Sequence, residues 1–254
     1  MNKFVLLPLL IGAALPIASS LAQHARDQHT PIVSATVGPF GFSANGSFRD
    51  MVRKRDFAPK TSLSEAMSSG ATDGVGALSG LRGEVTILGG RLIVSCGSKA
   101  TCAPPQQEAA TLLATTKARS WRVGVALPRD MDEAQFGEFI DAQARQAGLS
   151  LDAPFPVKVS GTLVEVRMHV ISSPNPAFTG HGGGHPMAIQ DEERASELNG
   201  GEVVGMRVPP ALQGIATHPG EAFHFHWVDA SRVRTAHLDG FKVKAGALLL
   251  LPVP

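Results

Sequence analysis

The chain has 254 residues and balances 23 basic against 22 acidic side chains, which gives a formal net charge of +1 at pH 7. Such a chain lacks the basic surface that binds nucleic acid or an anionic membrane, so neither is an expected partner. Its length is sufficient to bury a proper core, and 27 glycines and 18 prolines favour strands connected by turns.

Residues 1–22 have the features of a secretory signal peptide. A short basic start is followed by an apolar run from Phe4 to Ala18, and Ser20-Leu21-Ala22 supplies the small residues that signal peptidase requires. The run is short and is interrupted by Pro8 and Pro16, which disfavours a retained membrane anchor. The sequence therefore predicts an exported protein, periplasmic or secreted, that has no membrane segment once the signal is removed.

The predicted elements of the first half are, in chain order, a strand over 32–42, a solvated loop over 51–56, a helix over 62–67 and hairpin strands over 84–88 and 91–95. Ser62 followed three residues later by Glu65 is the pattern of a capped helix. Gly89-Gly90 supplies the turn chemistry of the hairpin. In an oxidising compartment Cys96 and Cys102 are expected to form a disulfide at the tip of a hairpin. Two thiolates near a metal are the alternative, but no histidine flanks them.

The predicted elements of the second half are strands over 121–127, 201–208 and 240–250, a helix over 132–147, a hairpin of strands 154–159 and 163–170, and a flexible loop over 172–184. Phe136, Phe139, Ile140 and Ala144 form one apolar stripe on that helix. Strands with few helices, mostly in antiparallel order, indicate an α+β class. We expect an N-terminal α+β subdomain over 23–150, which carries the cysteine hairpin, and a β-rich metal-binding subdomain over 151–254.

The stretch Phe223-His224-Phe225-His226-Trp227 is the most informative part of the chain. Alternate strand residues point to one face, so His224 and His226 project together while the aromatic rings face a core. His237, on a neighbouring strand, would supply a third imidazole. Three protein ligands with further positions left open are typical of a catalytic metal site. The alternative is three unrelated histidines on a sheet.

Several stretches, in the same order, resemble the alpha-acetolactate decarboxylase family of zinc enzymes, which convert acetolactate to acetoin and carbon dioxide. The similar stretches are 62–67, Gly83-Glu84 with the Gly89-Gly90 turn, 201–215, His224-Phe225-His226 and His237-Leu238-Asp239. They extend over about residues 32–250. The resemblance implies the fold of that family, mostly antiparallel sheets in two subdomains, with His224, His226 and His237 as Zn²⁺ ligands.

The resemblance also implies a reaction and a substrate. Loss of carbon dioxide beside a ketone leaves an enediolate, whose charge a divalent metal absorbs as a Lewis acid. Glu84 lies where the family has an active-site glutamate, which implies a proton carrier or a partner of the metal ligands. The alternative for Glu84 is an acid at a strand start that faces water. The expected partner is a small 2-hydroxy-3-keto acid, and the chain would act alone or as a homodimer.

Three positions depart from the family pattern. Ala77 replaces a threonine, Lys158 replaces an arginine of the hairpin, and His169 replaces a second arginine on the returning strand. Lys158 is expected to keep a cationic catalytic role, although an ammonium cannot grip a carboxylate with two parallel hydrogen bonds. Asp239 is expected to fix the tautomer of a ligand imidazole or to form a turn. The roles of His181 and His185, in a glycine-rich loop, stay open.

Two other hypotheses compete with a decarboxylase. One is a metal-binding or small-acid-binding protein on the same fold with impaired catalysis, which the departures at Ala77, Lys158 and His169 favour. The other is a cupin-type metalloenzyme, since cupins also carry two histidines on one strand. Cupins add a glutamate shortly after that pair, where this chain has Asp229.

Overall fold

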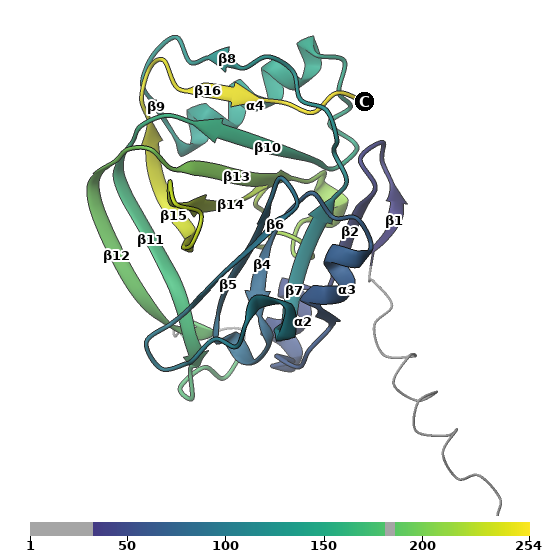
Figure 1. The fold of residues 1–254 in the computed structure, drawn as a ribbon, viewed down its shortest axis with the longest axis vertical. Coiled ribbons are helices and arrows are strands. Elements are labelled where there is room, and N and C mark those ends of the chain that lie inside the picture. The colour runs from purple at the N-terminus through teal and green to yellow at the C-terminus, as the bar shows by residue number, and fades with distance from the viewer. Residues whose placement is uncertain (1–32, 181–185) are drawn as a thin grey trace, which may run out of the picture.

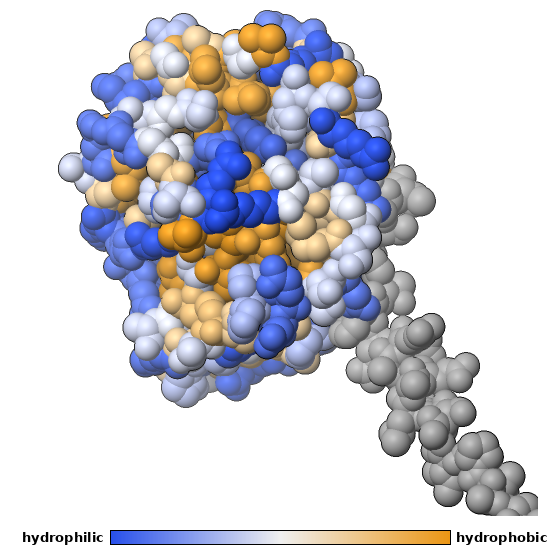
Figure 2. Space-filling model, viewed as in Figure 1, coloured by the Kyte–Doolittle hydropathy of each residue, from blue (hydrophilic) through white to orange (hydrophobic). Residues whose placement is uncertain are grey.

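The computed structural model describes residues 33–180 and 186–254 (Figure 1). The predicted signal peptide lies outside the described residues, as do His181 and His185. Within the described part of the chain, no helix has the length and apolar character needed to cross a bilayer. On the face that Figure 2 draws, hydrophilic residues cover most of the surface and apolar residues are visible between them.

The first sheet has seven strands, all antiparallel to their neighbours. Its order is β1 (Val33–Val37), β2 (Phe42–Asn45), β7 (Ala109–Thr116), β4 (Asp73–Leu78), β5 (Gly83–Leu88) and β6 (Arg91–Cys96), with β3 (Thr61–Ser62) also paired to β7. β4, β5 and β7 are buried along almost their whole length, which places them at the centre of the fold.

The second sheet has nine strands and is also antiparallel throughout. Its order is β12 (Ala188–Leu198), β11 (Leu163–Pro174), β15 (Thr235–Val243), β14 (Phe223–Val228), β13 (Glu202–Arg207), β10 (Phe155–Ser160), β16 (Leu248–Leu250) and β8 (Val125–Ala126), with β9 (Met131–Asp132) paired to β15. The two sheets pack against each other, and Val75 of β4 lies in one apolar cluster with Val204 and Met206 of β13.

Three α-helices and three 3₁₀ turns connect the strands in the described residues. They are α2 (Phe48–Lys54), α3 (Leu63–Ser68), α4 (Glu133–Gln146), η1 (Ser79–Leu81), η2 (Pro105–Gln107) and η3 (Pro210–Leu212). The predicted capping box of α3 is confirmed, because the Ser62 side chain accepts from the Glu65 N–H and the Glu65 carboxylate accepts from the Ser62 N–H. The predicted helix 132–147 is confirmed as α4.

The two faces of β14 enter different surroundings. Phe225 and Trp227 belong to the large apolar cluster that contains Phe136 of α4, whose ring centroid lies 6.0 Å from that of Phe225. Burying an aromatic or large aliphatic side chain in this way contributes about 1.5–3 kcal/mol. The histidines of the strand therefore face the first sheet, as the alternation in the sequence predicts.

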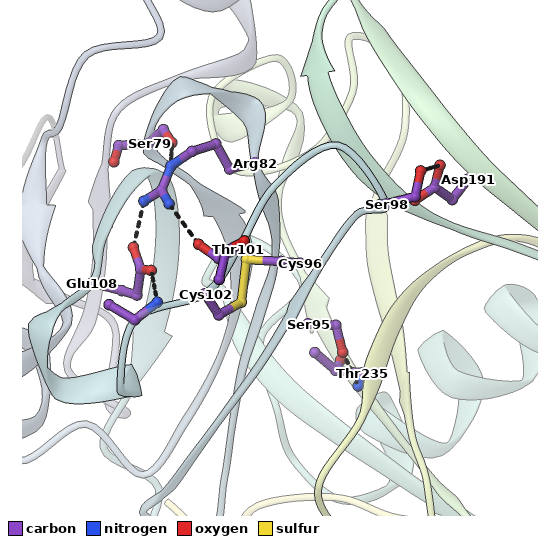
Figure 3. Close-up of a disulfide and its surroundings, with 11 residues drawn as sticks. Ser79, Arg82, Ser95, Cys96, Ser98, Thr101, Cys102, Glu108, Asp191 and Thr235 are labelled. Carbon is purple, nitrogen blue, oxygen red and sulfur yellow. Dashed lines mark hydrogen bonds and ion pairs between the residues drawn. A yellow bond between two sulfur atoms is a disulfide. The ribbon is translucent and has the colours of Figure 1, made fainter.

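The predicted disulfide is present between Cys96 and Cys102, whose Cα atoms are 5.6 Å apart. Figure 3 shows that it closes the loop after β6, with Arg82 bridging Glu108 and Thr101 beside it. The same hairpin contacts the second sheet, because the Ser95 hydroxyl accepts from the Thr235 N–H at 2.8 Å (Figure 3). The crosslink therefore supports a contact between the two sheets.

Three sequence expectations in the second half are wrong. Strands 154–159 and 163–170 exist but do not form a hairpin, because β10 lies between β13 and β16 while β11 lies between β12 and β15. Turn chemistry cannot tell whether the strands on either side of it pair. The expected strand 121–127 is reduced to β8 and one isolated bridge between Trp121 and Pro252. Val123, between them, is 93% exposed and does not pack in a core. The expected strand 240–250 is divided between β15 and β16.

Several elements have no counterpart in the sequence expectations, including β4 and β7 at the centre of the first sheet. α2 occupies part of the expected loop 51–56; Ser47 caps it and Met51 is buried beneath it. β12 was missed because its sequence is mostly charged and polar and has no apolar alternation; five of its eleven residues are exposed. Charged edge strands of this kind prevent pairing with other chains.

An ion pair connects the interiors of the two sheets. The Nζ of Lys158 on β10 lies 2.7 Å from the Oδ1 of Asp73 on β4, and the carboxylate side chain is fully buried. The ammonium also lies 4.0 Å from the centroid of the Trp121 ring. Removing one partner of a buried pair leaves the other charge without compensation, which is strongly destabilising.

We therefore expect Asp73→Asn to lower the free energy of unfolding by about 3–5 kcal/mol, measured by urea denaturation. The matched control is Asp130→Asn, because Asp130 forms a 2.7 Å pair with Lys244 in which both side chains are nearly half exposed. Such surface pairs contribute little, so the control should unfold like the parent. Equal stabilities of Asp73→Asn and the parent would contradict the assigned role.

Candidate metal centre

Three histidines converge between the sheets. His224 and His226 alternate on β14, and His237 on β15 pairs directly opposite His226. One nitrogen of each ring lies within 4.8 Å of the others. His226 is fully buried, His224 is 4% exposed and the His237 side chain is 12% exposed. The predicted grouping of the three imidazoles is thus present in the structure.

Hydrogen bonds orient two of these rings. The Nδ1 of His224 donates to the carbonyl oxygen of Ala216 at 3.0 Å, so its Nε2 carries the lone pair. The Nδ1 of His226 lies 2.9 Å from the Thr86 hydroxyl, which is itself 2.6 Å from the hydroxyl of Thr235. Both rings therefore present Nε2 to the same point.

The distance between the rings fits a shared ion. The two Nε2 atoms of His224 and His226 are 3.1 Å apart. Two nitrogens that each bind a tetrahedral zinc ion at about 2.0–2.1 Å are separated by about 3.3 Å. Burial lowers the pKa of His224 to about 3 and holds the pKa values of His226 and His237 well below their usual range. The neutral imidazole is the form that binds metals, so the donor set suits Zn²⁺.

Glu84 lies beside the histidines, as the resemblance predicts. Its Oε1 accepts from the N–H of Ile171 at 3.2 Å, and its Oε2 lies 3.7 Å from the Nε2 of His226. The residue is 3% exposed. Burial raises the pKa of this carboxyl to about 7, although the charge of His169 opposes the shift. A carboxyl in this position can hold a proton near neutral pH.

His169 of β11 is part of the same group. Its Nδ1 lies 2.7 Å from the Oδ2 of Asp239, and its Nε2 lies 3.1 Å from the amide nitrogen of Gln190 and 3.9 Å from the Oε1 of Glu84. Burial alone would lower the pKa of His169, but the hydrogen bond to Asp239 and the charge of Glu84 raise it. Asp239 thus fixes the orientation of His169, whereas its nearest oxygen is 4.0 Å from His237.

The structure gives the two remaining departures different surroundings. Ala77 lies on the wall of the cavity next to the histidines. Lys158 does not line that cavity, because its ammonium is held by Asp73 under the Trp121 ring. The residues that the structure brings together are therefore Glu84, His169 and the three histidines.

The cavity above the histidines has a volume of about 270 Å³. Its apolar walls include Met51, Leu81, Leu112, Ile171, Phe178 and Met187. Its polar side chains are Glu84, His169, Gln190, His218, His224 and His237. Sequence reasoning assigned no role to His218, because it stands in no motif. The only signal was its position six residues before His224, in the loop that enters the metal strand.

Comparison with known proteins identifies a family and a shared fold. The profile of the alpha-acetolactate decarboxylase family matches residues 50–252. No curated protein sequence matches the chain.

Solved structures share the fold. Alpha-acetolactate decarboxylase from Bacillus subtilis strain 168 matches with a TM-score of 0.65 and 12% identity, over 83% of this chain and 85% of that one. The enzyme from Bacillus subtilis subspecies spizizenii gives the same TM-score and coverage at 14% identity. A Staphylococcus aureus protein of unknown function, similar to alpha-acetolactate decarboxylase, gives 0.61 and 18% identity over 82% and 83%. The predicted α+β class with mostly antiparallel sheets is confirmed.

The contact between Thr86 and His226 predicts an effect on metal affinity. Thr86→Val removes the hydroxyl that orients the Nδ1 of His226, so Zn²⁺ affinity should fall about 10–100-fold in a chelator competition. Thr115→Val is the matched control, because Thr115 is also buried in the first sheet and lies away from the histidines. If both variants bind zinc equally well, Thr86 has no orienting role.

Proposed function

Because the chain belongs to the alpha-acetolactate decarboxylase family, we propose that it converts 2-acetolactate, or a close 2-hydroxy-3-keto acid, to acetoin and CO₂ with Zn²⁺ as cofactor. The observation that carries the proposal is the convergence of three neutral imidazoles, two of which, His224 and His237, line a cavity together with Glu84. The volume of about 270 Å³ suits a small molecule of this kind.

His224, His226 and His237 are the residues that would hold the ion. When bound, Zn²⁺ supplies a Lewis acid that disperses the negative charge left by the departing CO₂. The three ligands are neutral, so they leave the centre positively charged and favourable for an anionic substrate. The Ala216 carbonyl and the Thr86 hydroxyl keep the donor atoms in place before the ion arrives.

Glu84 is the proposed proton donor. Breaking the bond between the carboxylate carbon and the hydroxyl-bearing carbon releases CO₂ and leaves the electron pair on the hydroxyl-bearing carbon and the adjacent ketone. One proton must then bind to the hydroxyl-bearing carbon to give acetoin. The Ile171 N–H anchors one oxygen of Glu84 and the other faces His226, which directs the carboxyl to the cavity. Its elevated pKa supports this role, since a protonated carboxyl is available near pH 7.

The apolar walls of the cavity serve the same reaction. Side chains such as Leu112 and Phe178 offer no hydrogen bonds, so they exclude water from the carbanion and accommodate methyl groups. Carbon dioxide is uncharged, and an apolar surrounding favours it over the carboxylate from which it forms.

One observation favours a second candidate function. Lys158, the cation expected to replace a family arginine, is engaged with Asp73 outside the cavity. The second candidate is a metal-binding or small-acid-binding protein that has impaired catalysis. Purified protein that holds one zinc ion per chain but releases no acetoin from acetolactate would support it over the first proposal.

We also propose export to the periplasm or the medium, which the Cys96–Cys102 disulfide supports because such bonds persist in oxidising compartments. The expected result is mature protein in the periplasmic or extracellular fraction, beginning near residue 23 by N-terminal sequencing. Uncleaved protein in the cytosolic fraction would contradict it.

The catalytic proposal is tested by acetoin formation from racemic acetolactate. His226→Ala should lose both zinc and activity, while Glu84→Gln should keep the zinc and lose about 10²–10⁴-fold in kcat. Glu165→Gln is the control, because Glu165 is exposed and pairs with Lys242. Full activity of Glu84→Gln would exclude Glu84 as the proton donor, and an inactive parent with bound zinc would exclude the decarboxylase.

A further inference from the structure

His218 lies in the cavity without a hydrogen-bond partner for its ring among the residues that the structure describes. Its ring centroid is 4.2 Å from that of Phe48 on α2 and 5.8 Å from that of His237. The imidazole thus packs against Phe48 at an angle of 32° between the ring planes and also neighbours a candidate metal ligand. In either protonation state the ring has at least one N–H to donate.

The loop that carries His218 is fixed by its own hydrogen bonds. The carbonyl oxygen of His218 accepts from the N–H of Glu221 at 3.1 Å, and the Thr217 hydroxyl donates to the carbonyl oxygen of Glu221 at 2.6 Å. Ala216, two residues earlier, is the residue that orients His224. One loop therefore positions a metal ligand and the unpaired ring together.

The other polar side chains of the cavity are either hydrogen-bonded or, like His237, candidate metal ligands. His169 is held by Asp239 and lies against Gln190, while Glu84 accepts from Ile171. No lysine or arginine lines the cavity within the described residues. Leaving aside His237, a candidate metal ligand, His218 is the polar side chain among the described cavity residues that has no hydrogen-bond partner, so a substrate carboxylate that enters this space can accept from its ring.

We propose that His218 is a substrate-binding residue, which donates a ring N–H to the carboxylate of the 2-hydroxy-3-keto acid. This inference rests on the proposed function. It assigns to His218 the carboxylate-binding role that Lys158, held outside the cavity by Asp73, does not fill. The carboxylate is then held by one neutral or weakly basic donor instead of a bidentate arginine grip. The hydroxyl and keto oxygens of the substrate are left to face the histidine centre and Glu84.

The test uses 2,3-dihydroxy-2-methylbutanoate, the reduced form of acetolactate, which keeps the carboxylate and the hydroxyl but has no ketone to accept the electron pair. Its Kd is measured by calorimetry on the zinc-loaded protein. His218→Phe keeps a ring on Phe48 and removes the donor, so the Kd should rise about 10–100-fold, as for a lost hydrogen bond to a charged group. His218→Gln keeps an N–H and should weaken binding less.

Pro219→Ala is the control, because it alters the same loop at an exposed position. Zinc content and thermal midpoint should equal those of the parent in all three variants. If His218→Phe binds the analogue with the same Kd as the parent, the inference is overturned, because the ring would then serve only in packing. Loss of zinc from His218→Phe also overturns it, because the ring would be a metal ligand. A parent that does not bind the analogue overturns this inference and the proposed substrate class together.

Discussion

The structure depends on the burial of polar groups between two sheets. Three imidazoles and one carboxyl lie in an interior where an unpaired polar group costs several kcal/mol. Ala216, Thr86 and the Ile171 N–H each satisfy one of these groups. These partners come from a loop, from the first sheet and from the second sheet, so the site forms only when the two sheets pack together.

Several contacts hold the two sheets together. The Asp73–Lys158 pair connects β4 to β10, and the disulfide hairpin contacts β15 through Ser95 and Thr235. Thr235 is also hydrogen-bonded to Thr86, the residue that orients His226. Thr235, which contacts the disulfide hairpin, is thus connected to the candidate ligand His226 through two hydrogen bonds, one to Thr86 and one from Thr86 to His226.

Features that depend on residues close in sequence were the most predictable parts of the fold and the site. Alternation on one strand located His224 and His226, and the capping residues Ser62 and Glu65 located α3. Strand pairing was less predictable, because the Ser160-Gly161 turn connects two strands that pair with other partners. The charged sequence of β12 hid an edge strand, because it has no apolar alternation that would indicate a buried face.

The side chains that surround the metal ligands were harder to predict, because they depend on contacts distant in sequence. Lys158 matched a family arginine by position, yet a buried aspartate 85 residues away determines its orientation. His218 belongs to no motif, and in the cavity its ring packs against Phe48, which is distant in sequence. The central claim concerns the ligands themselves, and X-ray absorption at the zinc edge tests it most directly. The account predicts zinc with three imidazole nitrogens at about 2.0–2.1 Å, and zinc bound by sulfur at about 2.3 Å, or no zinc in the purified protein, would contradict it.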